Sequence, residues 1–456
     1  MARPLTKSSR PASASRSSAG YVLGLLFVGN LLNYYDRALP SVVLEPIKEE
    51  LALDDTQVGL LASAFVLVAA LAGVPLGRLA DRIPRTAVAG WGLFVWSAFT
   101  AAGGILTSFW GFFATRVGVG VGESSYAPAT GSLLADLYPS ERRSRAQSLF
   151  MLGFPIGTLL AFLTAGALAV GFDSWRAPFL IAAVPGIVVA FLVLRLREPD
   201  RGAAEPDRVP DQDREDRRTT SLLALGKARS MYGMLLAFAG YNFAAYAIGT
   251  FLTPVLQRYY GLSLITAGLV GGVVVGVTGL IGLLAGGRVL DRAARRSPEA
   301  RVRVAAYSLV AAAVFAFAGL AAGRGALWQL VVFLSLGYMF GIVYLAAAVP
   351  VVSDVIRPEQ RSGALGLLFA VGHLIGGAGG PVFVGALSDA LAAGSVSAAG
   401  ASTAAASTAA ASAHGLRTAL MITVPLAFAV AATGMLLASR YVRSDRDSML
   451  TRKTTT

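Results

Sequence analysis

Long apolar stretches alternate with short polar segments along the whole chain. A helix needs about 20 apolar residues to cross a bilayer. Backbone polar groups inside the hydrocarbon must be satisfied within their own segment, so each such stretch predicts a membrane-spanning helix. Twelve spans are predicted, at residues 19–44, 57–79, 86–107, 109–134, 145–170, 176–195, 230–256, 263–287, 303–322, 327–352, 361–389 and 416–438.

Lysine and arginine are distributed unevenly between the two sides of the predicted membrane. An even number of spans puts both termini on one side, and that side then holds most of the 39 basic residues. Cytoplasmic loops are enriched in Lys and Arg, so we predict cytoplasmic termini and a location in the bacterial inner (plasma) membrane. The outer loops are acidic at Glu45–Asp55 and hold only Lys48, Arg176, Arg258, Arg324 and Arg417 as basic residues.

Composition excludes several classes of protein. The chain has 456 residues, of which 55% are hydrophobic and 14% charged, whereas soluble proteins carry about 25% charged residues. With no cysteine and only His373 and His414, neither a disulfide framework nor a multi-histidine metal site is expected. We predict no metal and no cofactor. The net charge of +13 is mainly this loop asymmetry, so no nucleic-acid partner is predicted.

A polar segment, residues 197–229, divides the chain into two halves of six spans each.

The first span is predicted to be a retained helix rather than a cleaved signal peptide, because it continues directly into Asn33-Tyr34-Tyr35-Asp36-Arg37. Residues 392–414 are rich in Ala, Ser, Thr and Gly and are predicted to form a low-complexity outer loop. The predicted domains are a basic tail (1–18), an N-terminal bundle (19–196), a cytoplasmic linker (197–229), a C-terminal bundle (230–440) and a second tail (441–456).

The two halves repeat a loop motif. Gly77-Arg-Leu-Ala-Asp81-Arg82-Ile-Pro-Arg85 follows span 2, and Gly287-Arg-Val-Leu-Asp291-Arg292-Ala-Ala-Arg295 follows span 8. A second echo follows spans 4 and 10, where Asp136, Pro139, Glu141 and Arg142 correspond to Asp354, Pro358, Glu359 and Arg361. Such an internal duplication predicts a pseudo-symmetric pair of bundles with a central site between them.

The Gly-x-x-x-Asp-Arg-x-x-Arg loop resembles the signature loop of the major facilitator superfamily. The resemblance implies that the Gly permits close helix contact, that the Asp lies near a helix N-terminus of the other half, and that the Arg residues bind neighbouring carboxylates. Together they would latch the cytoplasmic side in the outward-facing state. The alternative is that these charges only set topology. The predicted cytoplasmic gate comprises Gly77, Asp81, Arg82, Arg85, Asp136, Arg142, Asp291 and Arg292.

A finer resemblance lies in the first half. The Asn33–Arg37 element, the Arg116–Pro128 element with its Gly122-Glu123-x-x-Tyr126-x-Pro128 core, and Gly153-Phe-Pro155-Ile-Gly157 look like the Spinster family. Ser124 stands where that family usually has Ala. The first element alone also occurs in organic-anion symporters of the same superfamily. The resemblance implies transport of sphingosine-1-phosphate or lysophospholipids, and we include Tyr126 among the predicted substrate-binding residues.

Four charged residues lie well inside predicted spans, away from the span ends, namely Asp36, Arg37, Arg116 and Glu123. A charge at the bilayer centre costs roughly 2.5–3.5 kcal/mol on insertion scales, so each one suggests a function and a partner. On span 1, Asn30, Asn33 and Arg37 share one helix face by their spacing, and on span 4 Arg116 and Glu123 do the same. We predict that these groups meet in the N-terminal half of a central cavity.

The chemistry of this set suggests a proton switch joined to an anion site. Burial in a low-dielectric cavity favours the neutral form of a carboxylic acid, so Asp36 and Glu123 are candidate proton carriers. An ionised carboxylate pairs with an arginine, and a protonated one releases that arginine to hold two oxygens of an anion. The alternative is a permanent ion pair that fixes span 1 against span 4, and for Arg116 the two interpretations are equally supported.

The C-terminal half of the cavity is predicted to be mostly apolar. His373 lies in span 11, and histidine titrates in the physiological range when unperturbed, which makes it a third candidate for proton coupling. A packing histidine is the alternative. Tyr241, Asn242, Tyr246, Tyr338 and Tyr344 are predicted to line this half and to contact substrate, and simple packing is the alternative for them.

We therefore predict an all-α membrane protein with twelve transmembrane helices in two pseudo-symmetric six-helix bundles. Its predicted function is proton-coupled secondary active transport of an amphipathic anion by alternating access, as a monomer and not as an enzyme. A lateral opening between helices favours a lipid substrate, and a closed aqueous cavity favours a small acid. The alternatives are an organic-acid:proton symporter or multidrug exporter on the same fold, or a facilitative channel or transport-dead receptor.

Overall fold

The computed structural model describes residues 19–200, 228–356, 360–399 and 404–451, and every regular element in these ranges is helical. The predicted all-α fold is confirmed. The predicted tail at 1–18 and most of the predicted linker lie outside the described residues, as does the side chain of Asp81.

The N-terminal half is built from eight helices that form six spans. Side-chain caps begin two of them, since Asp54 accepts a hydrogen bond from the backbone N–H of Gln57 and Ser108 does the same for Gly111. The elements are α1 (Ala19–Val42), α2 (Leu44–Glu50), α3 (Asp55–Arg82), α4 (Arg85–Gly103), α5 (Phe109–Leu137), α6 (Ser140–Met151), α7 (Gly153–Gly171) and α8 (Ala177–Leu194).

The C-terminal half has the same number of spans, but two of them contain a π-helical segment. Both π segments are rich in glycine, with sequences Gly-Val-Val-Val-Gly-Val and Gly-His-Leu-Ile-Gly-Gly-Ala. The elements are α10 (Arg229–Arg258), α11 (Leu264–Gly271), η3 (Gly272–Val277), α12 (Thr278–Arg296), α13 (Pro298–Leu320), α14 (Leu327–Val355), α15 (Arg361–Val371), η5 (Gly372–Ala378), α16 (Gly379–Ala399) and α17 (Ala404–Thr451).

Ten helical runs among the described residues are long and apolar enough to cross a membrane by length and composition alone. The remaining two of the twelve spans are α1 and α5. These two helices have 24 and 29 residues, which is long enough, but they carry Asp36, Arg37, Arg116 and Glu123. The charges that lower their hydropathy are those that the sequence singles out as functional.

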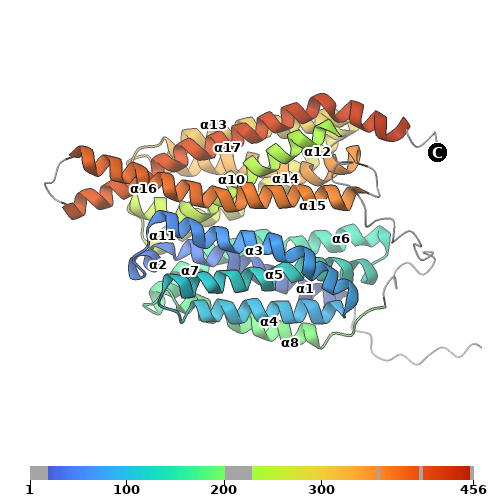
Figure 1. Cartoon of the computed structure of the whole chain (residues 1–456), viewed down its shortest axis with the longest axis horizontal. Helices are drawn as coiled ribbons and strands as arrows, with labels where there is room; N and C mark the ends of the chain where they lie inside the picture. Colours follow the sequence, from blue (N-terminus) through green and yellow to red (C-terminus); the bar gives the residue numbers. More distant parts are fainter. Residues whose placement is uncertain (1–18, 201–227, 357–359, 400–403, 452–456) are drawn as a thin grey trace, which may run out of the picture.

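The two halves lie side by side, with α1–α8 forming one layer of the molecule and α10–α17 the other (Figure 1). α1 begins and α17 ends at the same end of the bundle, here called the terminal end, and α2 lies at the opposite end. Leu26, Leu93 and Trp96 belong to an apolar core confined to the N-terminal half. A second core runs through the C-terminal half and continues into Leu39 and Ile47 of the N-terminal half.

The halves pack on each other mainly through two seams. α3 packs against α16 and η5, and α7 packs against α11 and η3. α6, α12 and α15, which occupy the terminal end, pack chiefly on helices of their own half. The structure is therefore closed at the opposite end.

The Ala/Ser/Thr-rich segment differs from the predicted low-complexity loop. α16 continues to Ala399, and α17 begins at Ala404 and runs for 48 residues. Alanine has the highest intrinsic helix propensity, which explains why a segment of low sequence complexity is helical in its described parts. The two helices project together beyond the other helices at the opposite end (Figure 1).

Candidate functional site

The predicted ionisable cluster forms at the interface of α1 and α5. Arg37 Nε donates a hydrogen bond to Glu123 Oε2 at 2.6 Å, and the side chain of Glu123 has no exposed surface while that of Arg37 is 30% exposed. The Arg37 guanidinium lies 4.9 Å from the ring centroid of Tyr34 and 5.1 Å from that of Phe65. Arg37 is therefore the member of the pair that a ligand can reach.

Asp36 and Arg116 lie behind this pair, inside the N-terminal half. Asp36 is 2% exposed and accepts a hydrogen bond from Thr100 Oγ1 at 3.4 Å. Arg116 is 4% exposed, and its guanidinium lies 5.2 Å from the ring centroid of Phe112. Its Nε and Nη2 have no hydrogen-bond partner within the described part of the chain. The structure thus brings the four predicted charges together, but only Arg37 is substantially accessible.

The other predicted N-terminal site residues are buried within their half. Asn30 Nδ2 donates to the carbonyl of Phe150 at 2.8 Å, and the Tyr126 hydroxyl donates to the carbonyl of Leu26 at 2.9 Å. Asn33 is 4% exposed. Asn30 and Tyr126 thus hold α1 against α6 and α5, which is a positioning role in the conformation seen here.

His373 and Tyr246 face the charge cluster from the C-terminal half. Their ring centroids lie 6.2 Å apart, and both residues are within electrostatic range of Arg37. His373 Nδ1–H donates to the carbonyl of Phe369 at 2.8 Å, which leaves Nε2 as the ring nitrogen able to take up a proton. Tyr246 and His373 thus lie on the C-terminal side of the boundary between the halves, facing Arg37.

The remaining predicted aromatic residues form a buried cluster next to this centre. The ring centroids of Tyr241 and Tyr344 lie 5.4 Å apart, and Tyr344 has no exposed surface. Tyr338 is 9% exposed, and Asn242 donates to the carbonyl of Phe238 one turn earlier in its own helix. In this conformation these four residues pack within the C-terminal half.

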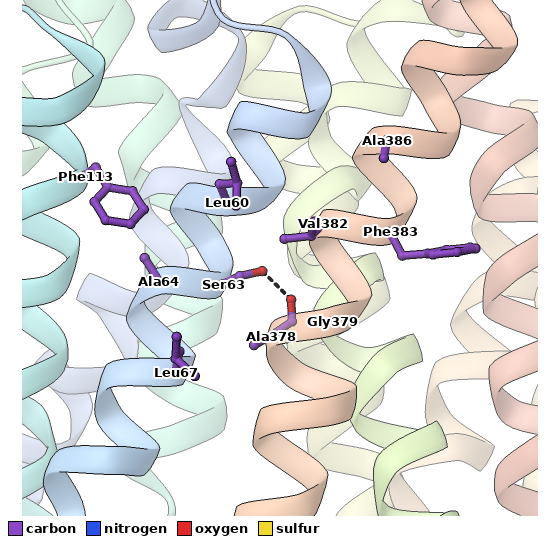
Figure 2. A pocket seen from close by; sticks show the side chains of 10 residues that line it. All are labelled: Leu60, Ser63, Ala64, Leu67, Phe113, Ala378, Gly379, Val382, Phe383 and Ala386. Carbon is purple, nitrogen blue, oxygen red and sulfur yellow. Dashed lines mark hydrogen bonds between the residues drawn. The ribbon is translucent and has the colours of Figure 1, made fainter.

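An apolar groove lies on the seam between α3 and α16, with a cavity volume of about 540 Å³ (Figure 2). Its walls include Leu60, Leu67 and Phe383, which are 39%, 42% and 55% exposed, so the groove opens onto the surface of the bundle. Ser63 Oγ donates to the Ala378 carbonyl at 2.5 Å across the seam. These residues carry no distinct signal in the sequence, because an apolar groove has the same composition as any membrane helix.

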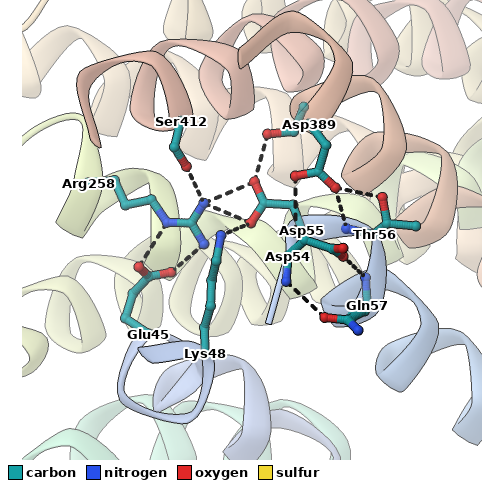
Figure 3. A network of polar contacts seen from close by, with 10 residues as sticks. Glu45, Lys48, Asp54, Asp55, Thr56, Gln57, Arg258, Asp389 and Ser412 are labelled. Carbon is teal, nitrogen blue, oxygen red and sulfur yellow. Dashed lines mark hydrogen bonds and ion pairs between the residues drawn. The ribbon is translucent and has the colours of Figure 1, made fainter. Parts of the chain in front are cut away.

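A second feature that the sequence analysis missed is a polar network at the opposite end (Figure 3). Arg258, the last residue of α10, binds both carboxylate oxygens of Glu45 at 2.7 and 2.8 Å and both of Asp55 at 2.8 and 3.0 Å. Lys48 Nζ lies 2.5 Å from Asp55 Oδ1. The acidic outer loop and the arginine that ends span 7 were visible in the sequence, but their pairing across the halves was not.

Residues of the predicted gate lie at the terminal end. Arg85 is 1% exposed and pairs with Asp136 and, at 2.7 Å, with Glu198. Burial acts to raise the pKa of Glu198, but hydrogen bonds from Thr86 N–H and Arg85 outweigh it and hold that pKa below its ordinary value. Within the part of the chain that the structure describes, the hydrogen bonds of Arg85 all go to residues of the N-terminal half.

An equivalent arginine–aspartate pair occurs in the second half, but its arginine is not the one that the sequence repeat aligns with Arg85. Arg301 of α13 lies 2.9 Å from Asp354 at the end of α14, in the position that Arg85 and Asp136 occupy in the first half. The sequence repeat aligned Arg85 with Arg295, which is exposed. A side chain on Gly77 would meet Pro128 of its own half, and Arg82, Arg142, Asp291 and Arg292 are exposed.

Comparison with known proteins identifies the family to which this fold belongs. The family model described as Major Facilitator Superfamily matches residues 26–381, across both halves. The chain belongs to the Major Facilitator Superfamily. This is a family of transporters rather than enzymes, and its fold is the predicted twelve-helix arrangement.

Individual relatives within the superfamily give a narrower description than the family model does. The chain is 32% identical to an MFS-type efflux pump of Mycolicibacterium smegmatis, over 81% of this chain and 84% of the relative. It is 27% identical to the sphingosine-1-phosphate transporter SPNS2 of Danio rerio, over 81% and 76% of the two chains. A crystal structure of a bacterial homologue of the human lysosomal transporter Spinster, inward-facing and unoccupied, superposes with a TM-score of 0.85 at 26% identity, covering 95% and 99%. The predicted resemblance to the Spinster family is confirmed.

Proposed function

We propose that this superfamily member is a proton-coupled secondary active transporter that moves an amphipathic anion by alternating access. The observation that carries the proposal is the contact between Arg37 and Glu123, in which a buried carboxylate holds a partly exposed guanidinium. Protonation of Glu123 removes the negative charge that binds Arg37. The freed guanidinium then binds two oxygens of a phosphate or carboxylate.

The proposed substrate is a lysophospholipid or a sphingosine-phosphate-like molecule. The apolar groove between α3 and α16 supports a lipid, because an opening on the membrane-facing surface suits a molecule that resides in the bilayer. Arg37 supplies the charge for the headgroup, and the exposed walls of the groove, which include Leu60, Leu67 and Phe383, supply the apolar surface. The name of the SPNS2 relative points to the same class.

We propose further that the termini are cytoplasmic and that the conformation is inward-facing. The uneven distribution of Lys and Arg supports this orientation, and so does the likeness to an inward-facing homologue. In this orientation the network around Arg258 closes the outer side. Gly77, Asp81, Arg82 and Arg85, with Asp136, Arg142, Asp291 and Arg292, then form the cytoplasmic gate that engages when the inner side closes.

Export of a small hydrophobic anion or drug is the second candidate function. The 32% identity to an MFS-type efflux pump favours it. The same Arg37–Glu123 switch would serve such a substrate, so the substrate and not the mechanism separates the two candidates.

Proteoliposome transport tests both. A pH gradient is imposed, and labelled lysophospholipid, sphingosine-1-phosphate and a small organic acid are offered in parallel. Wild type is compared with Glu123→Gln, Asp36→Asn and the control Asp173→Asn, whose carboxylate is exposed and outside the cluster. Gradient-driven lipid movement that is lost in the first two variants and kept in the control supports the proposal. Lipid movement indifferent to the gradient and to both variants overturns proton coupling, and movement of the organic acid alone overturns the lipid substrate.

A further inference from the structure

Asp389 of α16 caps the N-terminus of α3 across the boundary between the halves (Figure 3). Its carboxylate accepts hydrogen bonds from the backbone N–H of Asp55 at 3.2 Å and of Thr56 at 2.8 Å, and from Thr56 Oγ1 at 2.6 Å. Asp55 and Thr56 are the first two residues of α3. The first N–H groups of a helix lack intrahelical partners and carry partial positive charge, so a carboxylate is their natural acceptor.

The same helix end has a second cap that stays within its own half. Asp54 Oδ1 accepts from the backbone N–H of Gln57 at 2.6 Å, and Gln57 Oε1 accepts from the Asp54 N–H at 3.0 Å. α3 is therefore already provided with a capping box. Asp389 is not needed to begin the helix, and what it adds is a bond between the two halves.

Neighbouring residues of both helices fix the position of α16 against the start of α3. Ser388 Oγ donates to Asp55 Oδ2 at 2.7 Å, so two consecutive residues of α16 bind the first turn of α3. Gly385 and Gly59 allow the two backbones to approach each other, since a side chain on Gly385 would meet the carbonyl of Asp55 and one on Gly59 would meet the carbonyl of Pro381. The hydrogen bonds of Asp389 and Ser388 to α3 form only when α3 and α16 lie against each other.

We propose that Asp389 is a latch that holds the opposite end of the transporter closed and that releases α3 whenever that end opens. The resemblance of the Gly77–Arg85 loop to the family's signature loop implies a second latch at the other end of the same helix, through Asp81. The two ends of this 28-residue helix are separated by roughly 42 Å. α3 is then held at one end when the opposite end of the bundle is closed, and at its other end when the terminal end is closed. The proposal rests on alternating access, but not on the substrate or on proton coupling.

Distances between spin labels test the latch without any transport assay. The chain contains no cysteine, so introduced pairs label cleanly. Glu49→Cys with Ala410→Cys reports on the opposite end, and Leu149→Cys with Val289→Cys reports on the terminal end, and all four positions are exposed. Each pair is placed in wild type, Asp389→Ala, Asp389→Asn and the control Asp54→Ala in lipid nanodiscs. Asp54→Ala removes a cap from the same helix end without touching the other half.

We expect wild type and Asp54→Ala to give one short distance at the opposite end. Asp389→Ala should increase a longer-distance population there by roughly tenfold, the size of a lost helix cap, with a matching shorter population at the terminal end. Asp389→Asn keeps one acceptor oxygen and should fall between the two. Unchanged distances in folded Asp389→Ala or Asp389→Asn, or an equal shift in Asp54→Ala, would overturn the proposal. Because no transport is measured, unchanged distances would count against the latch and leave the proposed function standing.

Discussion

Arg37 Nε and Glu123 Oε2 lie 2.6 Å apart, and the two side chains differ sharply in exposure, at 30% for Arg37 and 0% for Glu123. The pair therefore has a side that a ligand reaches and a side that only a small species such as a proton reaches. In the proposed proton-coupled mechanism, this asymmetry would assign substrate binding to Arg37 and proton uptake to Glu123.

The first prediction concerns the charge of Glu123. In Glu123→Gln the side chain is permanently neutral, so Arg37 is free to bind an anion. We expect this variant to bind sphingosine-1-phosphate or a lysophospholipid roughly tenfold more tightly than wild type at neutral pH, because a hydrogen bond to a charged group is worth about 1.5–3 kcal/mol. Isothermal titration calorimetry in detergent measures the affinity.

The control for this experiment is Glu49→Gln, whose side chain is exposed at the opposite end. It should bind as wild type does. Weaker binding by Glu123→Gln would show that the carboxylate itself contributes to the site, and would contradict its role as a competitor for Arg37.

The second prediction concerns Arg258. Arg258→Ala leaves Glu45 and the 1%-exposed Asp55 without their main cationic partner, and removal of one member of a buried ion pair costs about 3–5 kcal/mol. We expect a clear drop in the thermal unfolding midpoint in detergent. Arg324→Ala is the comparison, because Arg324 is exposed and lies over the Tyr259 ring at 5.2 Å. Its loss should cost at most about 1 kcal/mol, and equal effects of the two substitutions would refute the structural role of Arg258.

The third prediction uses two glycines of one helix. A Cβ at Gly385 would collide with the Asp55 backbone, whereas a Cβ at Gly394 would meet nothing within 4 Å. Gly385→Ala should therefore separate α3 from α16 and lengthen the label distance at the opposite end, and Gly394→Ala should leave it unchanged. If both variants keep the wild-type distance, the close approach of α3 and α16 does not control closure.

The fourth prediction concerns pH and Glu50, at the end of α2. Hydrogen bonds from Arg176, and then from Trp175, lower the pKa of Glu50 to about 2. A carboxylate whose folded-state pKa is lowered stabilises the protein above its unfolded-state pKa near 4.5 and loses that contribution as the pH falls toward 2. Glu50 is largely solvated, so the stabilisation is small.

Tryptophan fluorescence measures this titration, because Trp175 Nε1 donates to Glu50 Oε2 at 2.6 Å. A variant with Trp175 as its only tryptophan should show a transition below pH 4 that disappears in Glu50→Gln. A transition that persists in Glu50→Gln would assign the change to another group.

The helices and their grouping into halves could be predicted from the sequence, because length and hydropathy determine membrane spans almost without reference to tertiary contacts. The meeting of Asp36, Arg37, Arg116 and Glu123 could also be predicted, since charges in a span need partners. The difference between Arg37 and Arg116 could not. Both are arginines on polar helix faces, and only packing against Phe112 and Phe179 places Arg116 inside its half.

Contacts across the two halves were beyond the reach of the sequence. Asp389 looks like an isolated charge near the end of span 11, and Arg258 like one near the end of span 7. Their partners lie hundreds of positions earlier in the chain, and no periodicity links them. The π segments were invisible for a similar reason, since a Gly-rich stretch in a membrane helix is equally compatible with a regular α-helix.

The π-helical segment η5 connects two of these features. A π turn accommodates one more residue than an α turn, so it acts as a one-residue insertion within span 11. His373 lies within this segment and Asp389 follows it. One residue corresponds to a rotation of about 100° about the helix axis, so deletion of a single residue from η5 would turn Asp389 away from α3 while the helix before it stayed in place. The angular offset about the helix axis between His373 and Asp389 thus depends on one extra residue in η5.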